Sequence, residues 1–233
     1  MHLFHSPDLL GDLIELPEEE AHHATAVLRL AQGTRIGLLD GSGTRAIAII
    51  EQVTKRSCTV RIVERMTTAA ERTARIHLAV APTKQMDRYE WLVEKAVEVG
   101  VDRITPLITE RTERGKLRID RLQRVAISAM KQSQRTWLPR IDELTTVKAL
   151  LASTLPPQRL FGWCEGEHRS VMEAYVPQQD AVLLIGPEGD FTAEEADAVR
   201  GQGFTAVSIG AARLRTETAG LAAGTWMSLA QQR

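Results

Sequence analysis

Two glycine-marked loops near the carboxyl end of the chain hold the residues best suited to chemistry. The first follows the apolar run 181–185 and reads Gly-Pro-Glu-Gly-Asp over residues 186–190. The second follows 206–209, begins at Gly210 and opens a helix at about Thr216. Short buried strands that end in glycine let the backbone approach a ligand closely and form a recurring small-molecule site in α/β folds. We therefore expect these loops to bind a small molecule.

Each loop carries one charged side chain with two open interpretations. Glu188 is either a loop carboxylate near the positive start of the next helix or a base or electrostatic partner for a bound molecule. Arg215, at the opening of the last helix, either pairs with an acid or holds carbonyl or phosphate oxygens as a planar donor. For both residues, the two interpretations stay open at this point.

The elements that must position these loops alternate between strand and helix from residue 76 onward. Strands are expected over 76–81, 104–108, 160–163, 181–185 and 206–209. Helices are expected over 84–99, 118–133 and 168–175, after the cap Thr192, and from about Thr216. Such alternation predicts an α/β fold with a mainly parallel sheet covered on both faces.

A smaller, mostly β module precedes this region. A helix is expected over 17–30, and strands over 35–40, 46–50 and 58–63. The polar stretch 66–75 shows no periodicity and is interpreted as a linker. We therefore predict two domains, residues 1–68 and 74–233.

The segment 41–46 matches the G-x-G-x-x-G/A pattern of dinucleotide-binding loops. Such a loop must open a helix, so that the helix N-terminus faces the pyrophosphate. The residues that follow Gly43 are rich in isoleucine, which favours a strand. The pattern is therefore interpreted as a hairpin turn, which argues against a nicotinamide-dependent dehydrogenase.

Composition narrows the class of protein. The 233 residues are 43% hydrophobic and carry a net charge of −1, as expected of a globular protein with a full core. No apolar run reaches the roughly 18 residues of a membrane-spanning helix, and no secretory signal is expected. Two isolated cysteines, Cys58 and Cys164, fit a reducing cytoplasm. The pair His22-His23 lacks a third ligand, so no metal is predicted.

Positive charge is concentrated between Arg111 and Arg140, a segment that contains nine basic and two acidic residues. One interpretation is a solvated helix face, and the other is a phosphate-binding surface. Both stay open from the residues alone.

These motifs resemble those of bacterial RsmE-type methyltransferases of the SPOUT superfamily. The matching residues are Ile185-Gly186-Pro187-Glu188-Gly189, Ile209-Gly210 and Leu214-Arg215-Thr216-Glu217-Thr218-Ala219. Segments 94–101, 104–107 and 110–111 also match, as do His23, Val27-Leu28-Arg29 and Asp40-Gly41. The chain departs from the family's pattern at Asp190, where a second glycine is usual, and at Lys131, where an acid is frequent.

The resemblance implies methylation of N3 of a uridine in 16S ribosomal RNA, with S-adenosylmethionine as the methyl donor. It also implies a trefoil-knotted SPOUT domain after an RNA-binding PUA-like β-barrel domain, and a homodimer that acts on the small ribosomal subunit. Alternatives are a ribose 2′-O-methyltransferase of the same superfamily and a non-catalytic RNA-binding assembly factor.

The resemblance also assigns roles to residues. Glu188 and Arg215 are expected at the reacting base. The expected cofactor contacts are Ile185, Gly186, Pro187, Gly189, Ile209, Gly210, Leu214, Thr216 and Glu217. Arginine planes can receive a splayed base, and the expected RNA contacts are Arg29, Arg111, Arg114 and Arg135. A solvated surface position is the alternative for each of these four arginines.

Overall fold

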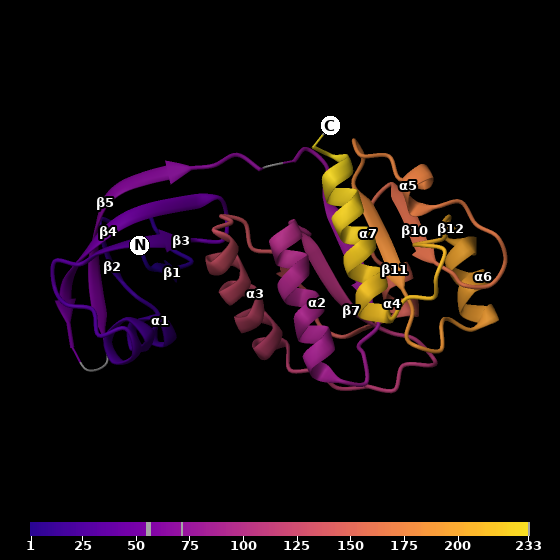
Figure 1. Cartoon of the computed structure of the whole chain (residues 1–233), viewed down its shortest axis with the longest axis horizontal. Coiled ribbons are helices and arrows are strands. Elements are labelled where there is room, and N and C mark those ends of the chain that lie inside the picture. The colour runs from indigo at the N-terminus through magenta and orange to yellow at the C-terminus, as the bar shows by residue number, and fades with distance from the viewer. Residues whose placement is uncertain (55–56, 71, 233) are drawn as a thin grey trace. The chain divides into compact units, whose positions relative to one another are not determined.

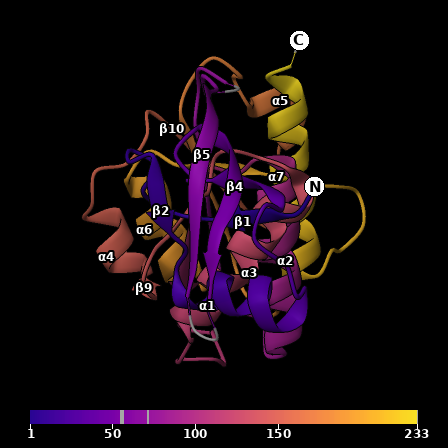
Figure 2. The ribbon, with the colours of Figure 1, turned by 90° about the vertical axis from the view of Figure 1, so that its left-hand side faces the viewer.

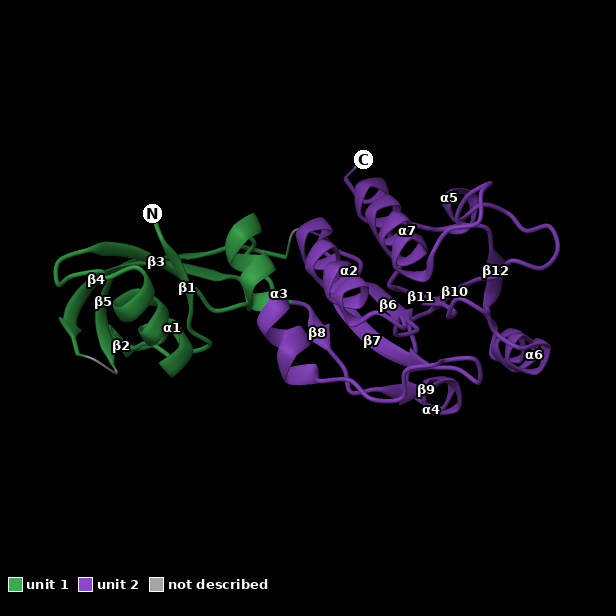
Figure 3. Ribbon diagram, turned by 60° about the horizontal axis from the view of Figure 1, so that its bottom comes forward, with its two compact units in different colours: residues 1–71, 127–138 green, residues 72–126, 139–233 purple. Residues whose placement is uncertain are grey.

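A computed structural model describes residues 1–54, 57–70 and 72–232 and divides the chain into two compact units (Figure 1). The first unit contains Met1–Glu71 and Ile127–Leu138, and the second contains Arg72–Ala126 and Pro139–Arg233. The chain changes units within one helix, as the colours of Figure 3 show. Residues 127–138, expected in the C-terminal domain, therefore pack with the N-terminal module.

The first unit is built on a five-stranded sheet, ordered β1-β3-β4-β5-β2. The long β4–β5 hairpin faces the viewer in Figure 2. The elements are β1 (Leu3–His5), β2 (Leu13–Glu15), α1 (Glu18–His22), the π-helical turn η1 (His23–Val27), β3 (Arg35–Leu39), β4 (Thr44–Val53) and β5 (Cys58–Thr67). The expected helix and three strands are present, whereas β1 and β2 are too short to show a sequence period.

The glycine pair 41–43 forms a turn that leads into β4, as expected. Asp40 Oδ1 accepts hydrogen bonds from the backbone N–H groups of Ser42 (2.7 Å) and Thr44 (2.8 Å). Gly43 has φ +102°, and a Cβ there would lie 2.5 Å from Cζ2 of Trp137. Because an indole ring fills the space beside Gly43, the turn holds no room for a dinucleotide.

Backbone hydrogen bonds and an ion pair connect the segment 127–138 to the rest of the first unit. The Gly43 N–H donates to Thr136 O, and the Leu138 N–H donates to Gly41 O, each at 2.9 Å. Lys131 Nζ lies 2.5 Å from Glu20 Oε1, and both side chains are largely buried. Lys131, a departure from the family's pattern, is therefore half of an internal ion pair.

The second unit is built on a parallel sheet ordered β12-β10-β11-β6-β7-β8, with β9 also paired to β7. Its elements are β6 (Ile76–Val80), α2 (Met86–Val99), β7 (Arg103–Ile108), α3 (Ile119–Ser133, shared with the first unit), β8 (Arg140–Ile141), β9 (Thr145–Thr146), α4 (Val147–Leu151), β10 (Gln158–Gly162), α5 (Val171–Ala174), β11 (Ala181–Ile185), α6 (Ala193–Gly201), β12 (Thr205–Val207) and α7 (Thr216–Ala230). The expected parallel sheet is confirmed, and β8, β9 and α4 are additions.

Helices cover both faces of this sheet. On one face α2 and α7 lie side by side (Figure 1), and Gly220 of α7 lets that helix approach Leu92 of α2 and Val80 of β6. On the other face a core cluster joins α4 and α6 to the sheet, with Phe161 and Leu184 fully buried in it. Strand β11 is therefore buried along its whole length.

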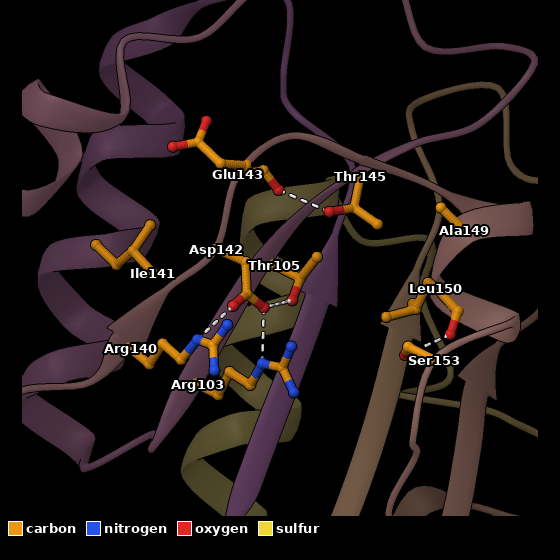
Figure 4. Close-up of a pocket in the computed structure, with 10 residues that line it drawn as sticks. All are labelled: Arg103, Thr105, Arg140, Ile141, Asp142, Glu143, Thr145, Ala149, Leu150 and Ser153. Atoms are coloured by element: carbon orange, nitrogen blue, oxygen red, sulfur yellow. Dashed lines mark hydrogen bonds and ion pairs between the residues drawn. The ribbon is translucent and has the colours of Figure 1, made fainter.

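A polar network lies along the β7 edge of the sheet (Figure 4). His77 Nε2 lies 2.7 Å from Thr105 Oγ1, and Thr105 donates to Asp142. Arg103 Nε donates to the same carboxylate at 2.7 Å, and Arg140 Nε lies 2.8 Å from its other oxygen. The other four residues of this network help to line a cavity of about 390 Å³, which His77 does not reach. Burial, aided by the Arg103 guanidinium, lowers the pKa of His77 to about 4.

We predict that acid destabilises the second unit through His77. Its pKa of about 4 lies below the ordinary 6.5, so the unfolded chain binds more protons between these values. The contribution of the neutral His77 ring to the free energy of unfolding is fully present above pH 6.5. Up to about 3 kcal/mol of this contribution is lost as the pH drops to 4. The pKa of Asp142 is below its usual 3.8, so this group adds its effect only at more acidic pH.

Urea unfolding at several pH values measures this loss. His77→Gln removes the titrating group, so the variant should show a flatter profile between pH 6.5 and 4. A variant as acid-sensitive as the wild type would contradict the assignment to His77.

Candidate active site

Three loops of the second unit meet at the carboxyl edge of its sheet. They follow β10, β11 and β12, and because β10 pairs in parallel with both other strands, the three strand ends lie together. The start of α7 closes the group, since Thr216 Oγ1 donates to Gly186 O at 3.1 Å in a buried position. The structure thus brings together the two glycine loops. The cavity of Figure 4 lies elsewhere, at the β7 edge, which β6 separates from β11.

The first loop leaves the core and turns back within a few residues. Ile185, Gly186 and Pro187 are buried, whereas Glu188 and Gly189 are exposed. A Cβ on Gly186 would lie 3.2 Å from both the Asp190 carboxylate and the Phe191 ring. A side chain at position 186 would therefore crowd the loop's own packing, because protein atoms fill the space beside Gly186.

Two arginines hold the backbone of this loop. Arg111 Nη1 donates to Gly189 O at 2.6 Å and to Phe191 O at 3.2 Å. Arg213 Nη2 donates to Glu188 O at 3.3 Å. Arg111 was expected as an RNA contact, and the structure gives it a loop contact; Arg213 carries no local sequence signal for its role.

The second loop is more open. A Cβ on Gly210 would meet just Leu214 Cδ1, at 3.9 Å, so space remains beside this glycine. Ile209 and Leu214 are half-buried, and Gly210 is exposed. This loop, more than the first, offers free backbone and free volume to a ligand.

The start of α7 combines buried and exposed polar groups. Thr216 and Glu217 are buried, and Glu217 Oε1 lies 3.9 Å from Arg88 Nε. Arg215 is the N-cap residue, and its side chain makes no capping hydrogen bond. The first backbone N–H groups of α7 therefore keep the partial positive charge of a helix start.

The two expected catalytic side chains are uncommitted charges at this edge. Glu188 and Arg215 are both exposed. Across the described ranges, neither the Glu188 carboxylate nor the Arg215 guanidinium has a hydrogen-bond or ion-pair partner. Thr192 and Glu195 already form the capping box of α6, so Glu188 is not needed there. Its uncommitted charge favours a ligand-directed role.

The other arginines expected to contact RNA divide between the units. Arg114, in the second unit, donates to Lys84 O at 2.7 Å and is half-buried. Arg29 and Arg135 belong to the first unit, where Arg29 is exposed with φ +52°. The four arginines therefore do not form one cluster within either unit.

Among the residues that the structure describes, no three His, Cys, Asp or Glu side chains are grouped as metal ligands would be. No helix there has the length and apolar character that crossing a membrane requires.

Comparison with known proteins gives the class. Residues 70–228 match the model of an RNA methyltransferase domain, and residues 16–63 match that of an RNA methyltransferase PUA domain. A solved structure from Porphyromonas gingivalis is described as a probable rRNA-methyltransferase. It is 39% identical to this chain and superimposes with a TM-score of 0.90, and the match covers 100% of this chain and 99% of the Porphyromonas chain.

Two relatives carry a more specific description, ribosomal RNA small subunit methyltransferase E. The structure from Neisseria gonorrhoeae, bound to S-adenosyl methionine, is 30% identical with a TM-score of 0.88 and covers 99% of this chain and 98% of its own. The protein from Synechocystis is 30% identical over 213 residues, which are 88% of this chain and 69% of the relative.

The class is thus an RNA methyltransferase with a PUA domain. Within that class, the chain belongs to the ribosomal RNA small subunit methyltransferase E family. The expected architecture, an α/β domain with a mainly parallel sheet after a PUA-like β domain, is confirmed.

We predict that Thr216→Val destabilises the second unit by about 1–2 kcal/mol, because the buried Gly186 carbonyl loses its donor. Valine keeps the shape, so packing is preserved. Thr218→Val, at an exposed position of the same helix turn, is the matched control. Denaturant unfolding measures both, and equal stability of the two variants would show that the Thr216 hydrogen bond contributes nothing.

Proposed function

We propose that this chain transfers a methyl group from S-adenosylmethionine to N3 of a uridine in 16S ribosomal RNA of the small subunit. Family membership supports the ribosomal RNA substrate, and the relative solved with S-adenosyl methionine supports the cofactor. The observation that carries the proposal is the meeting of the two glycine loops at the Thr216–Gly186 hydrogen bond.

The residues at this edge suit the cofactor's chemistry. The start of α7 can receive an anionic group such as its carboxylate, and Glu188 offers a negative charge to its sulfonium. The free volume beside Gly210 leaves room for a ring. We assign the cofactor contacts to Ile185, Gly186, Pro187, Gly189, Ile209, Gly210, Leu214, Thr216 and Glu217.

When bound, S-adenosylmethionine supplies a methyl group activated by a positive sulfur. The chain must then place uracil N3 in line with that methyl group and remove the N3 proton, and positioning alone is worth several kcal/mol. We assign proton removal or charge stabilisation to Glu188. Arg215 would hold the uridine carbonyl oxygens or a flanking phosphate through its planar guanidinium.

We assign RNA binding to the PUA-like domain, residues 1–68, and methyl transfer to residues 74–233. Arg29, Arg111, Arg114 and Arg135 would contact the RNA, with Arg111 also holding the glycine loop. The expected place of action is the cytoplasm, where bacterial ribosomal subunits are assembled.

We also propose that the protein is a homodimer. Met172 of α5 and Leu229 of α7 are each more than half exposed, and these helices contact each other. Exposed apolar side chains of this kind suit an interface with a second copy of the chain. The trefoil knot implied by the resemblance stays a prediction.

A methylation assay tests the proposed reaction. Small subunits from a strain that lacks the enzyme are incubated with the protein and S-adenosylmethionine, and their nucleosides are analysed by mass spectrometry. N3-methyluridine is the expected product. A 2′-O-methylated ribose would point to the alternative methyltransferase, and a protein that does not bind S-adenosylmethionine would be the assembly factor.

We predict that Arg215→Ala lowers turnover roughly 100-fold, as expected on losing one transition-state donor. The fold should be unaffected because the guanidinium is exposed. Arg75→Ala, which removes an exposed arginine just before β6 in the same unit, is the control. Initial rates on small subunits measure the effect, and wild-type rates from the Arg215 variant would refute its catalytic role.

A further inference from the structure

We propose that Asp190 is a positioning residue that fixes the first glycine loop to the turn after β10, and so sets where Glu188 stands. This inference rests on the proposed function and deepens it. Asp190 itself would touch neither the methyl donor nor the base.

The backbone at Asp190 forms the turn that carries Glu188. Its φ of +62° lies in the left-handed region, which most side chains avoid and aspartate tolerates better than most. Its N–H donates to Pro187 O at 2.9 Å and closes a tight turn around Glu188 and Gly189. The loop therefore reverses at Asp190 with Glu188 at its exposed tip.

Each carboxylate oxygen of Asp190 accepts a hydrogen bond from a backbone N–H group. Oδ1 accepts from the Phe191 N–H at 2.8 Å, and Oδ2 accepts from the Cys164 N–H at 3.0 Å. The first bond is local, but the second reaches the segment that follows β10. Because β10 lies between β11 and β12, this bond joins the first loop to the middle strand of the three whose ends form the site.

Packing fixes the carboxylate in this position. The Phe191 ring is fully buried and meets the ring of Phe161 on β10 edge to face, with centroids 6.1 Å apart. Gly186 leaves the space that the Asp190 carboxylate and the Phe191 ring occupy. The loop is thus held by Asp190 on one side and by Arg111, through Gly189 O, on the other. Its tip has little freedom to move.

The test compares S-adenosylmethionine binding and kinetics in wild type, Asp190→Asn and Asp190→Gly. Both substitutions suit a left-handed φ, so the turn is retained while the carboxylate is lost. We expect the glycine variant to raise the KM for S-adenosylmethionine or lower kcat by at least roughly tenfold, since small misplacements are costly. The asparagine variant keeps one acceptor and should fall between.

A second measurement reads the contact without activity. Burial and then the Asp190 charge raise the pKa of the Cys164 thiol. A neutral residue at 190 should therefore speed modification of this exposed thiol by a disulfide reagent at least about twofold at pH 8. The buried Cys58 is an internal reference.

Asp197→Asn is the matched control, because this exposed aspartate pairs just with Arg200 of its own helix. It should leave both measurements unchanged. Wild-type kinetics in Asp190→Gly, or unaltered Cys164 reactivity in Asp190→Asn, would overturn the positioning role alone. A wild-type protein that fails to bind S-adenosylmethionine would overturn the proposed function as well.

Discussion

The parallel pairing of β10 with β11 and β12 is the constraint on which the site depends. It places three chain reversals at one edge of one sheet, and hydrogen bonds then join them. Thr216 reaches Gly186 from the start of α7, and Asp190 reaches Cys164 from the first loop. The groups proposed to bind the ligand come from different segments: the Glu188 carboxylate from the loop after β11, and open backbone and a helix start from the segment between β12 and α7.

Charge at this edge is divided between structural and free groups. Arg111 and Arg213 donate hydrogen bonds to backbone carbonyl groups of the first loop. In the ranges that the structure describes, the side chains of Glu188 and Arg215 are exposed and have no such partner. This division fits the proposed methyl transfer, because the loop is held in place while a carboxylate and a guanidinium stay available to a ligand. In the network around Asp142, by contrast, each carboxylate oxygen lies beside an arginine of the same network.

Much of this arrangement could be predicted from sequence, for identifiable reasons. Continuous apolar runs such as 181–185 marked buried strands, and the Thr192–Glu195 spacing marked a helix start. Isoleucine after Gly43 correctly distinguished a hairpin from a nucleotide loop. Contacts between distant segments could not be predicted: the docking of 127–138 on the first unit and the Asp190–Cys164 bond depend on tertiary packing, which has no local period. The site residues themselves were proposed mainly through family resemblance.

A crystal structure of the chain with S-adenosylmethionine bound would show whether the two glycine loops hold the methyl donor together. We expect the donor between loops 186–190 and 208–215, with its sulfur on the side of Glu188 and its amino-acid end near the start of α7. Electron density for the donor in the cavity beside Arg103 and Asp142, or anywhere away from these two loops, would contradict it.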